Sequence, residues 1–200
     1  MSGSPLHERI LDATAGITIG GGWAAVSMGK VASAVGVSRQ TVHTEVGTKS
    51  ALAEALVIRE VEGFLTEVVA GFDGAEDVPQ AIERSITRVL VRSEESALVR
   101  GVVSAAHGAD TELLPLLTTR PEHLLELATA TVQGLVAPFA LPLPQARIDA
   151  TIEVIVRVAL SQVMHPTASP HEIGEHLAWM VRVVLESLPE DATAAEDGLS

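Results

Sequence analysis

The chain has 200 residues, enough for one large or two small domains with a substantial buried core. Although 47% of the residues are hydrophobic, no apolar run reaches the ~18 residues of a membrane span, and no signal-peptide pattern opens the chain. We therefore expect a cytoplasmic protein that makes no membrane contact. The absence of cysteine excludes disulfides, thiolate metal sites and a cysteine nucleophile.

The formal net charge of −13 argues against a general nucleic-acid-binding protein. The charge is unevenly distributed, because residues 1–50 carry four basic and three acidic side chains, whereas the remaining 150 residues carry nine and 23. A DNA-binding surface in the first 50 residues would be nearly neutral, so its affinity must come from local contacts rather than from long-range attraction.

Residues 5–19 are predicted to form the first helix, because Leu6, Ile10, Ala13 and Ile17 recur on one face. The three glycines at residues 20–22 lack the preceding strand and the lysine of a phosphate-binding loop, so we expect a simple loop there. No arrangement of serine, histidine and aspartate in the sequence matches a nucleophile motif, which argues against an enzyme.

The next stretch has the pattern of a helix-turn-helix. Ser27 is a suitable N-cap for a short helix, and Gly36 falls where a helix needs a residue with positive φ to end in a sharp turn. Ser38 then caps a second helix, from Arg39 to about Thr44. Two short helices joined by such a turn form the motif whose second helix enters the DNA major groove.

The second helix offers hydrogen-bonding side chains on its exposed face. Arginine suits the edge of guanine and glutamine that of adenine, so we expect Arg39 and Gln40 to read bases. Lys30 and Lys49 are expected to hold phosphates. The full predicted DNA-binding set is Ser27, Lys30, Ser38, Arg39, Gln40, Thr41, His43, Thr44 and Lys49.

In these motifs the chain resembles the TetR-type transcriptional repressors. The resemblance begins with ILDA at residues 10–13 and Gly22-Trp23, is closest at AVGVSRQTV in residues 34–42, and ends with TKSAL in residues 48–52. It implies an all-α homodimer of about nine helices. An N-terminal three-helix DNA-binding domain and a C-terminal ligand-binding and dimerisation domain would bind double-stranded operator DNA and a small effector.

The chain departs from the family pattern after the recognition helix begins. The family usually reads Tyr-x-His-Phe where residues 43–46 here are His-Thr-Glu-Val. The phosphate-gripping tyrosine is replaced by His43, the anchoring phenylalanine by Val46, and Glu45 is expected to repel the phosphate backbone. The alternative is a protein of the same fold that has lost useful DNA binding and acts as a ligand-binding or interaction protein.

The rest of the sequence is also helical in pattern. A long fourth helix, residues 48–70, is capped by Thr48, and further helices are predicted from residue 78 and over 94–106, 121–138, 145–165 and 170–188. Residues 111–117 are predicted to form a short helix or a turn. Ser169 and Glu172 form a capping box at the start of the last predicted helix. We assign residues 1–50 to the DNA-binding domain, 51–189 to the ligand-binding and dimerisation domain, and 190–200 to a disordered acidic tail.

The last two predicted helices have apolar stripes wider than one buried face requires. The family resemblance implies that these helices pair with those of a second copy in a four-helix bundle. We therefore predict that Ile155 and Val184 lie in the dimer interface.

Composition limits the kind of ligand that the C-terminal part can bind. With 2% aromatic residues and no tyrosine, a pocket would be walled by aliphatic side chains, which suits an aliphatic lipophile better than an aromatic drug. The alternative is a packed aliphatic core without a cavity. The predicted ligand-binding residues are Arg88, His107, His123, Leu127 and Ile152.

A metal site is the remaining candidate. His171 and His176 are five residues apart and so diverge by about 140° on a helix, whereas Glu172 and His176 share a face and could clip a surface ion. A solvated polar face explains the same residues, so we expect neither a metal nor a cofactor.

Overall fold

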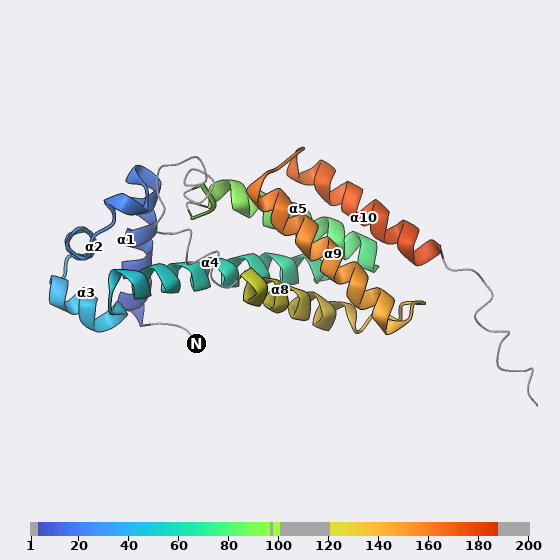
Figure 1. Ribbon diagram of the computed structural model, residues 1–200, viewed down its shortest axis with the longest axis horizontal. Coiled ribbons are helices and arrows are strands. Elements are labelled where there is room, and N and C mark those ends of the chain that lie inside the picture. The colour runs from blue at the N-terminus through green and yellow to red at the C-terminus, as the bar shows by residue number, and fades with distance from the viewer. Residues whose placement is uncertain (1–3, 97, 101–120, 188–200) are drawn as a thin grey trace, which may run out of the picture.

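The computed structural model describes residues 4–96, 98–100 and 121–187, with the side chains of residues 121–124 left out. In this part of the chain all regular structure is helical, as predicted (Figure 1). The predictions for residues 111–117, for the tail at 190–200 and for most of 94–106 lie outside the described residues. The helices are α1 Pro5–Gly21, a 3-10 turn Trp23–Ala25, α2 Met28–Val35, α3 Arg39–Val46, α4 Lys49–Phe72, α5 Val78–Glu95, α8 Pro121–Val136, α9 Gln145–Met164 and α10 Pro170–Glu186.

The helices form two groups along one long axis. Helices α1 to α3 gather at one end, and α4 runs from them into a block made of α5, α8, α9 and α10 (Figure 1). Each group encloses its own set of buried apolar side chains, and α4 contributes to both sets. None of the helices described is long and apolar enough to cross a membrane.

Capping residues set the starts of the helices as predicted. The hydroxyl of Ser27 accepts from the backbone N–H of Lys30 at 3.3 Å, and that of Thr48 accepts from Ala51 at 3.2 Å. Gly36 ends α2 with φ of 79°, in the left-handed region that favours glycine. Ser169 and Glu172 form the predicted capping box of α10.

The predicted glycine loop is wrong in part. Gly20 and Gly21 continue α1, and only Gly22, with φ of 70°, leaves the helix. Two buried threonines in the second half of α1 send their hydroxyls to backbone carbonyls four residues earlier, Thr14 to Ile10 at 2.7 Å and Thr18 to Thr14 at 2.8 Å. The buried polar groups of α1 are thus satisfied within the helix.

Each helix of the N-terminal group contributes a fully buried apolar side chain to the core. These are Ile10 of α1, Val31 of α2, Val42 of α3 and Leu52 of α4. Val46, which replaces the family's phenylalanine, is 8% exposed and belongs to the same cluster. The smaller side chain therefore still holds the end of α3 in the core.

The C-terminal group is organised around α5, which packs against both α4 and α10. A glycine permits close approach at each crossing. A Cβ on Gly71 of α4 would lie 2.2 Å from the Ser85 hydroxyl, and one on Gly174 of α10 would lie 2.4 Å from the Thr87 hydroxyl. The three helices therefore pack backbone to backbone more closely than larger residues would allow.

Leu98, which follows the end of α5, connects the C-terminal block to the N-terminal group of helices. Leu98 is 6% exposed and packs in the N-terminal cluster, with residues of α1 to α4. The chain thus returns from the C-terminal block to the N-terminal core shortly after α5 ends.

Candidate functional site

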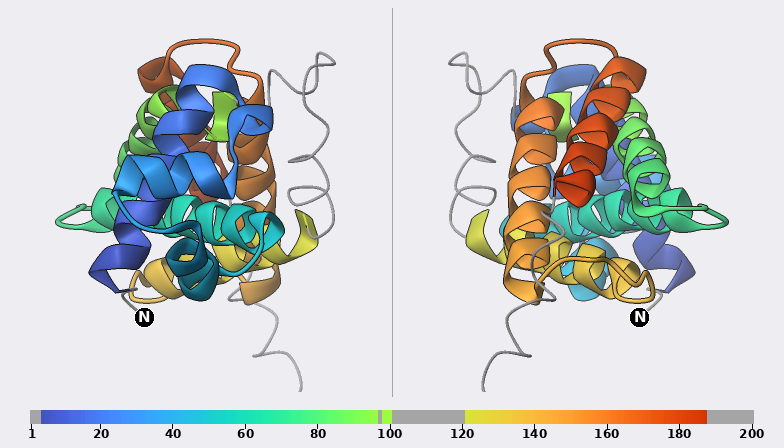
Figure 2. Two further views of the ribbon diagram at one scale, coloured as in Figure 1. Left: turned by 90° about the vertical axis from the view of Figure 1, so that its left-hand side faces the viewer. Right: turned by 90° about the vertical axis from the view of Figure 1, so that its right-hand side faces the viewer.

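The helix-turn-helix consists of α2, the turn at residues 36–38, and α3 (Figure 2). Val42 and Val46 are buried, and they fix which side of α3 faces outward. The opposite side is polar, and its exposed side chains are Arg39, Gln40, His43 and Thr44. Ser27, Lys30 and Ser38 are also exposed, and Thr41 and Lys49 are half-buried.

Local hydrogen bonds occupy two of the predicted DNA-binding threonines. The Thr41 hydroxyl lies 2.8 Å from that of Ser38, which also accepts from the Thr41 backbone at 3.0 Å. The Thr44 hydroxyl donates to the carbonyl of Gln40 at 2.9 Å. These hydroxyls stabilise the start and the middle of α3.

Two long-range contacts fix the helix-turn-helix against α1. A guanidinium nitrogen of Arg9 donates to the carbonyl of Val35 at 2.6 Å, near the end of α2. The Ser4 hydroxyl, which caps α1, donates to the carboxylate of Glu45 in the last turn of α3. Glu45 is therefore half-buried against α1, and its expected repulsion of the phosphate backbone stays a prediction.

Lys49 begins α4 beside this surface. Its ammonium nitrogen lies 5.2 Å from the centroid of the buried Trp23 ring, within the range of a cation–π contact. The contact orients the lysine at the N-terminus of a helix. The sequence pattern at Gly22-Trp23 does not indicate this contact, because Lys49 is 26 residues away.

The predicted ligand-binding residues do not share one site in the described part of the chain. Arg88 pairs with Glu67 of α4 at 2.8 Å, and Leu127 is 41% exposed. Ile152 is buried and lines a narrow apolar cavity of ≈30 Å³ between α5, α9 and α10. His107 and the side chain of His123 lie outside the described residues.

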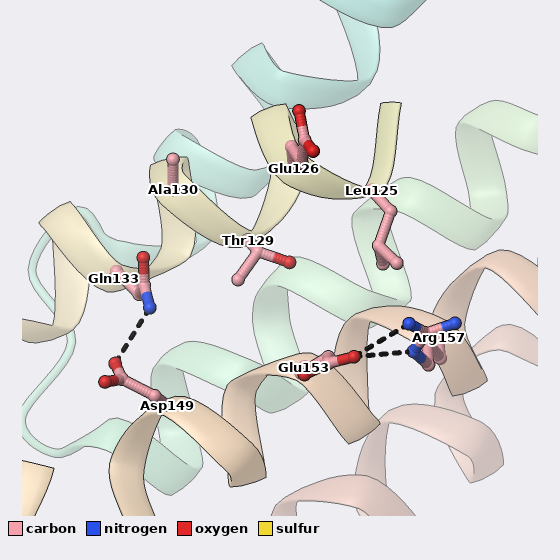
Figure 3. Close-up of a pocket in the computed structure, with 8 residues that line it drawn as sticks. All are labelled: Leu125, Glu126, Thr129, Ala130, Gln133, Asp149, Glu153 and Arg157. Carbon is pink, nitrogen blue, oxygen red and sulfur yellow. Dashed lines mark hydrogen bonds and ion pairs between the residues drawn. The ribbon is translucent and has the colours of Figure 1, made fainter. Parts of the chain in front are cut away.

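A larger and more polar groove lies between α8 and α9. Its volume is ≈490 Å³, and Figure 3 shows the side chains that line it. Sequence reasoning missed this groove. The signal was polar side chains at four-residue spacing on both helices, which places each set on one face. Its lining residues are Leu125, Glu126, Thr129, Ala130, Gln133, Asp149, Glu153 and Arg157.

Burial contradicts the predicted dimer contact at Ile155, whereas the contact at Val184 stays a prediction. Ile155 is 7% exposed within the protomer's own core, and Val184 is half-buried beside the narrow apolar cavity. Helices α9 and α10 lie at the outer surface of the block (Figure 2). Their exposed apolar side chains are Val154 and Leu160 of α9 and Trp179, Met180 and Val183 of α10.

One histidine near the start of α10 lies beside a carboxylate on the protein surface. The His171 Nε2 lies 3.4 Å from a carboxylate oxygen of Glu175. Hydrogen bonds from the hydroxyl and the backbone N–H of Ser169 hold the pKa of Glu172 below its usual value of 4.5. Within the described residues, no three histidine or acidic side chains gather as a metal site.

A helix-turn-helix with an exposed polar recognition helix, mounted on a separate helical core, defines a DNA-binding regulator. Residues 10–56 match the family model described as bacterial regulatory proteins of the tetR family. Residues 77–182 match the model for the C-terminal domain of the bacterial tetracyclin repressor. The chain therefore belongs to the TetR family, and it is a transcriptional regulator.

Individual relatives agree with this assignment. The chain is 27% identical over 177 residues to the HTH-type transcriptional regulator AlkX of Mycobacterium tuberculosis, covering 88% of this chain and 83% of that protein. The chain is also similar to the crystal structure of the TetR family repressor AlkX from Dietzia sp., which is implicated in biodegradation of n-alkanes. The two sequences are 25% identical, and the structures superpose with a TM-score of 0.69. That match covers 88% of this chain and 96% of the Dietzia chain. The fatty acid degradation regulator FadR from Bacillus halodurans shares the fold, with 15% identity and a TM-score of 0.57 over 92% and 100% of the two chains.

Proposed function

We propose that the protein is a cytoplasmic, homodimeric repressor that binds operator DNA through α3, and that an aliphatic effector releases it. The observation that carries the proposal is the exposed polar face of α3, held in place by the buried Val42 and Val46. We assign the protein no enzymatic activity.

The DNA-binding roles follow from exposure and position. Arg39 and Gln40 stand exposed in the first turn of α3, where recognition helices contact base edges. Lys30 lies in the first turn of α2 and Lys49 begins α4, so both can place a cation beside a phosphate at a helix N-terminus. His43 is exposed on the same face as Arg39 and assists.

The exposed apolar face of α9 and α10 supports a dimer. Trp179 is 62% exposed, and Val183 follows one turn later on the same face of α10. A contiguous apolar patch of this kind marks an association surface. Pairing two copies through it would present two α3 helices to half-sites about 34 Å apart.

Two observations favour an aliphatic effector. The C-terminal core has Phe72 and Phe139 as ring-bearing side chains in its cluster and is otherwise aliphatic. The Dietzia AlkX repressor, similar to this chain, is implicated in biodegradation of n-alkanes. The narrow cavity at Ile152 must widen to admit an alkyl chain. Such widening would displace α5, and Leu98, three residues beyond the end of this helix, packs in the N-terminal core.

Selection of genomic DNA fragments by the purified protein tests this function. We expect enrichment of a palindromic site whose affinity falls steeply with salt. A long-chain alkane or acyl compound should raise the melting temperature and release that site. Enrichment of no sequence above random DNA would indicate a TetR-fold protein without operator binding.

A further inference from the structure

The groove between α8 and α9 has walls of different character. Leu125 and Thr129 of α8 face Asp149, Glu153 and Arg157 of α9 across the gap (Figure 3). Glu126 and Ala130 lie at the rim in the same view. The groove is open to solvent, and its volume of ≈490 Å³ falls within the roughly 300–1,000 Å³ of small-molecule sites.

The polar groups of the groove are held in place by hydrogen bonds. Asp149 accepts from the side-chain amides of Gln133 at 2.8 Å and Gln145 at 3.0 Å, and both bonds go to the same carboxylate oxygen. Glu153 accepts from two guanidinium nitrogens of Arg157, at 3.0 and 2.7 Å. The second oxygen of Asp149 thus remains to accept a further donor in a fixed position.

The charge of the lining is negative. Glu126, Asp149 and Glu153 supply three carboxylates, and Arg157 supplies the single guanidinium of the lining. The guanidinium is already paired with Glu153, so a ligand carboxylate would meet an excess of like charge. A cationic or hydrogen-bond-donating ligand would meet acceptors.

A buried hydroxyl in the same groove lacks a partner. The Oγ1 of Thr129 is buried and has no hydrogen bond among the described residues. A buried polar atom without a hydrogen-bond partner destabilises the protein, and a ligand that donates to it or accepts from it would remove this cost. The neighbouring Leu125 is half-buried and supplies apolar surface for a short hydrocarbon.

From these four features, we propose that the groove binds an organic ammonium ion with a short aliphatic chain. The ammonium donates to Asp149, and the chain lies along Leu125 and Thr129. This site is separate from the narrow apolar cavity at Ile152 that we assign to the aliphatic effector, and it goes beyond the proposed repressor function.

Isothermal titration calorimetry on the full-length protein tests the site with three probes of equal chain length. We expect n-hexylammonium to bind, hexan-1-ol to bind more weakly, and hexanoate to show no binding. Asp149→Asn keeps the shape and the amide contacts but removes the charge, and should weaken n-hexylammonium about tenfold. Thr129→Val keeps the shape and removes the hydroxyl, and should also weaken it.

The matched control is Glu175→Gln, which removes one exposed carboxylate of α10 outside the groove. Its affinity for n-hexylammonium should equal that of the unmodified protein. If Glu175→Gln weakens the probe as much as Asp149→Asn does, the binding is general attraction to an acidic chain, and the proposal is wrong. Equal affinity for hexanoate, or no binding of any probe, also overturns it, while leaving operator release by a lipophile unaffected.

Discussion

The hydroxyl of Ser4 donates to the carboxylate of Glu45, so the start of α1 is joined to the last turn of the recognition helix. Ser4 also accepts from the backbone N–H of His7 at 3.1 Å as the N-cap of α1. One serine therefore stabilises α1 and holds an acidic side chain of the DNA-binding surface against the protein.

Removing this contact should affect stability and DNA binding together. Ser4→Ala should lower the free energy of unfolding by about 1 kcal/mol through loss of the cap, and should weaken operator binding because Glu45 is released towards the phosphates. Glu45→Gln keeps an acceptor for Ser4 and removes the charge, so operator affinity should rise modestly. Thermal denaturation and fluorescence anisotropy measure both effects; weaker binding by Glu45→Gln would contradict this role.

Arg39 and Lys49 should differ in how they affect specificity. Arg39→Ala should cost about 1–3 kcal/mol on the operator and relax preference at one base pair. Lys49→Ala should weaken all DNA about equally and flatten the salt dependence. Lys49→Arg, which keeps a cation over Trp23, is the control. Equal loss of operator and random-DNA binding by Arg39→Ala would reverse the two assignments.

The dimer should depend on the exposed face of α10 and not on the core-facing residues. Val183→Glu should give monomers at micromolar concentration, measured by sedimentation velocity, because it places a charge in an apolar interface. Ile58→Glu changes a similarly exposed aliphatic residue on α4 and should leave the dimer intact. Ile155→Glu should instead unfold the protomer. A protein that is monomeric before any substitution excludes this interface.

Effector release should require the apolar cavity at Ile152. A tryptophan there should block the aliphatic effector by filling the cavity, while DNA binding remains because the residue lies in the C-terminal core. Leu127→Trp, at an exposed position on α8, is the control and should still respond. Retained operator release by Ile152→Trp, measured by mobility shift, would place the effector elsewhere.

Acid should loosen the start of α10 through Glu172. Because the two Ser169 hydrogen bonds hold the pKa of this carboxyl below 4.5, their stabilisation is present above that pH and is lost as the pH falls through the lowered value. Protection of the amides in the first turn of α10 against hydrogen exchange, measured relative to the unstructured rate at each pH, should therefore decrease below about pH 4.5. Glu172→Gln should remove this pH dependence, and an unchanged profile in that variant would exclude the capping box as its source.

The features that the sequence predicted correctly are mainly local. Helix caps and tight turns depend on residues within four positions of each other, so they can be predicted from the sequence. The caps at Ser27, Ser38 and Thr48 and the turn at Gly36 are of this kind. The partner of Glu45 is 41 residues away, and no periodicity indicates it. The exposed face of α3 followed from the spacing of its buried valines.

The exposed apolar face and the groove of the C-terminal helices could not be predicted from the sequence, because both depend on how the helices pack against one another. Helix α9 carries Val154, which is exposed, directly beside Ile155, which is buried in the protomer. Periodicity alone cannot separate a face that packs within one chain from a face that meets a second copy. The groove between α8 and α9 likewise depends on helix packing, because neither helix forms it alone.

The position of Leu98 makes the N-terminal helices incomplete as a fragment. A polypeptide ending with α4 would retain the recognition helix and its caps but would lack the side chain that fills this part of the core. The resulting void would expose apolar surface of the neighbouring helices. The isolated fragment should therefore melt at a lower temperature than the same helices in the intact chain.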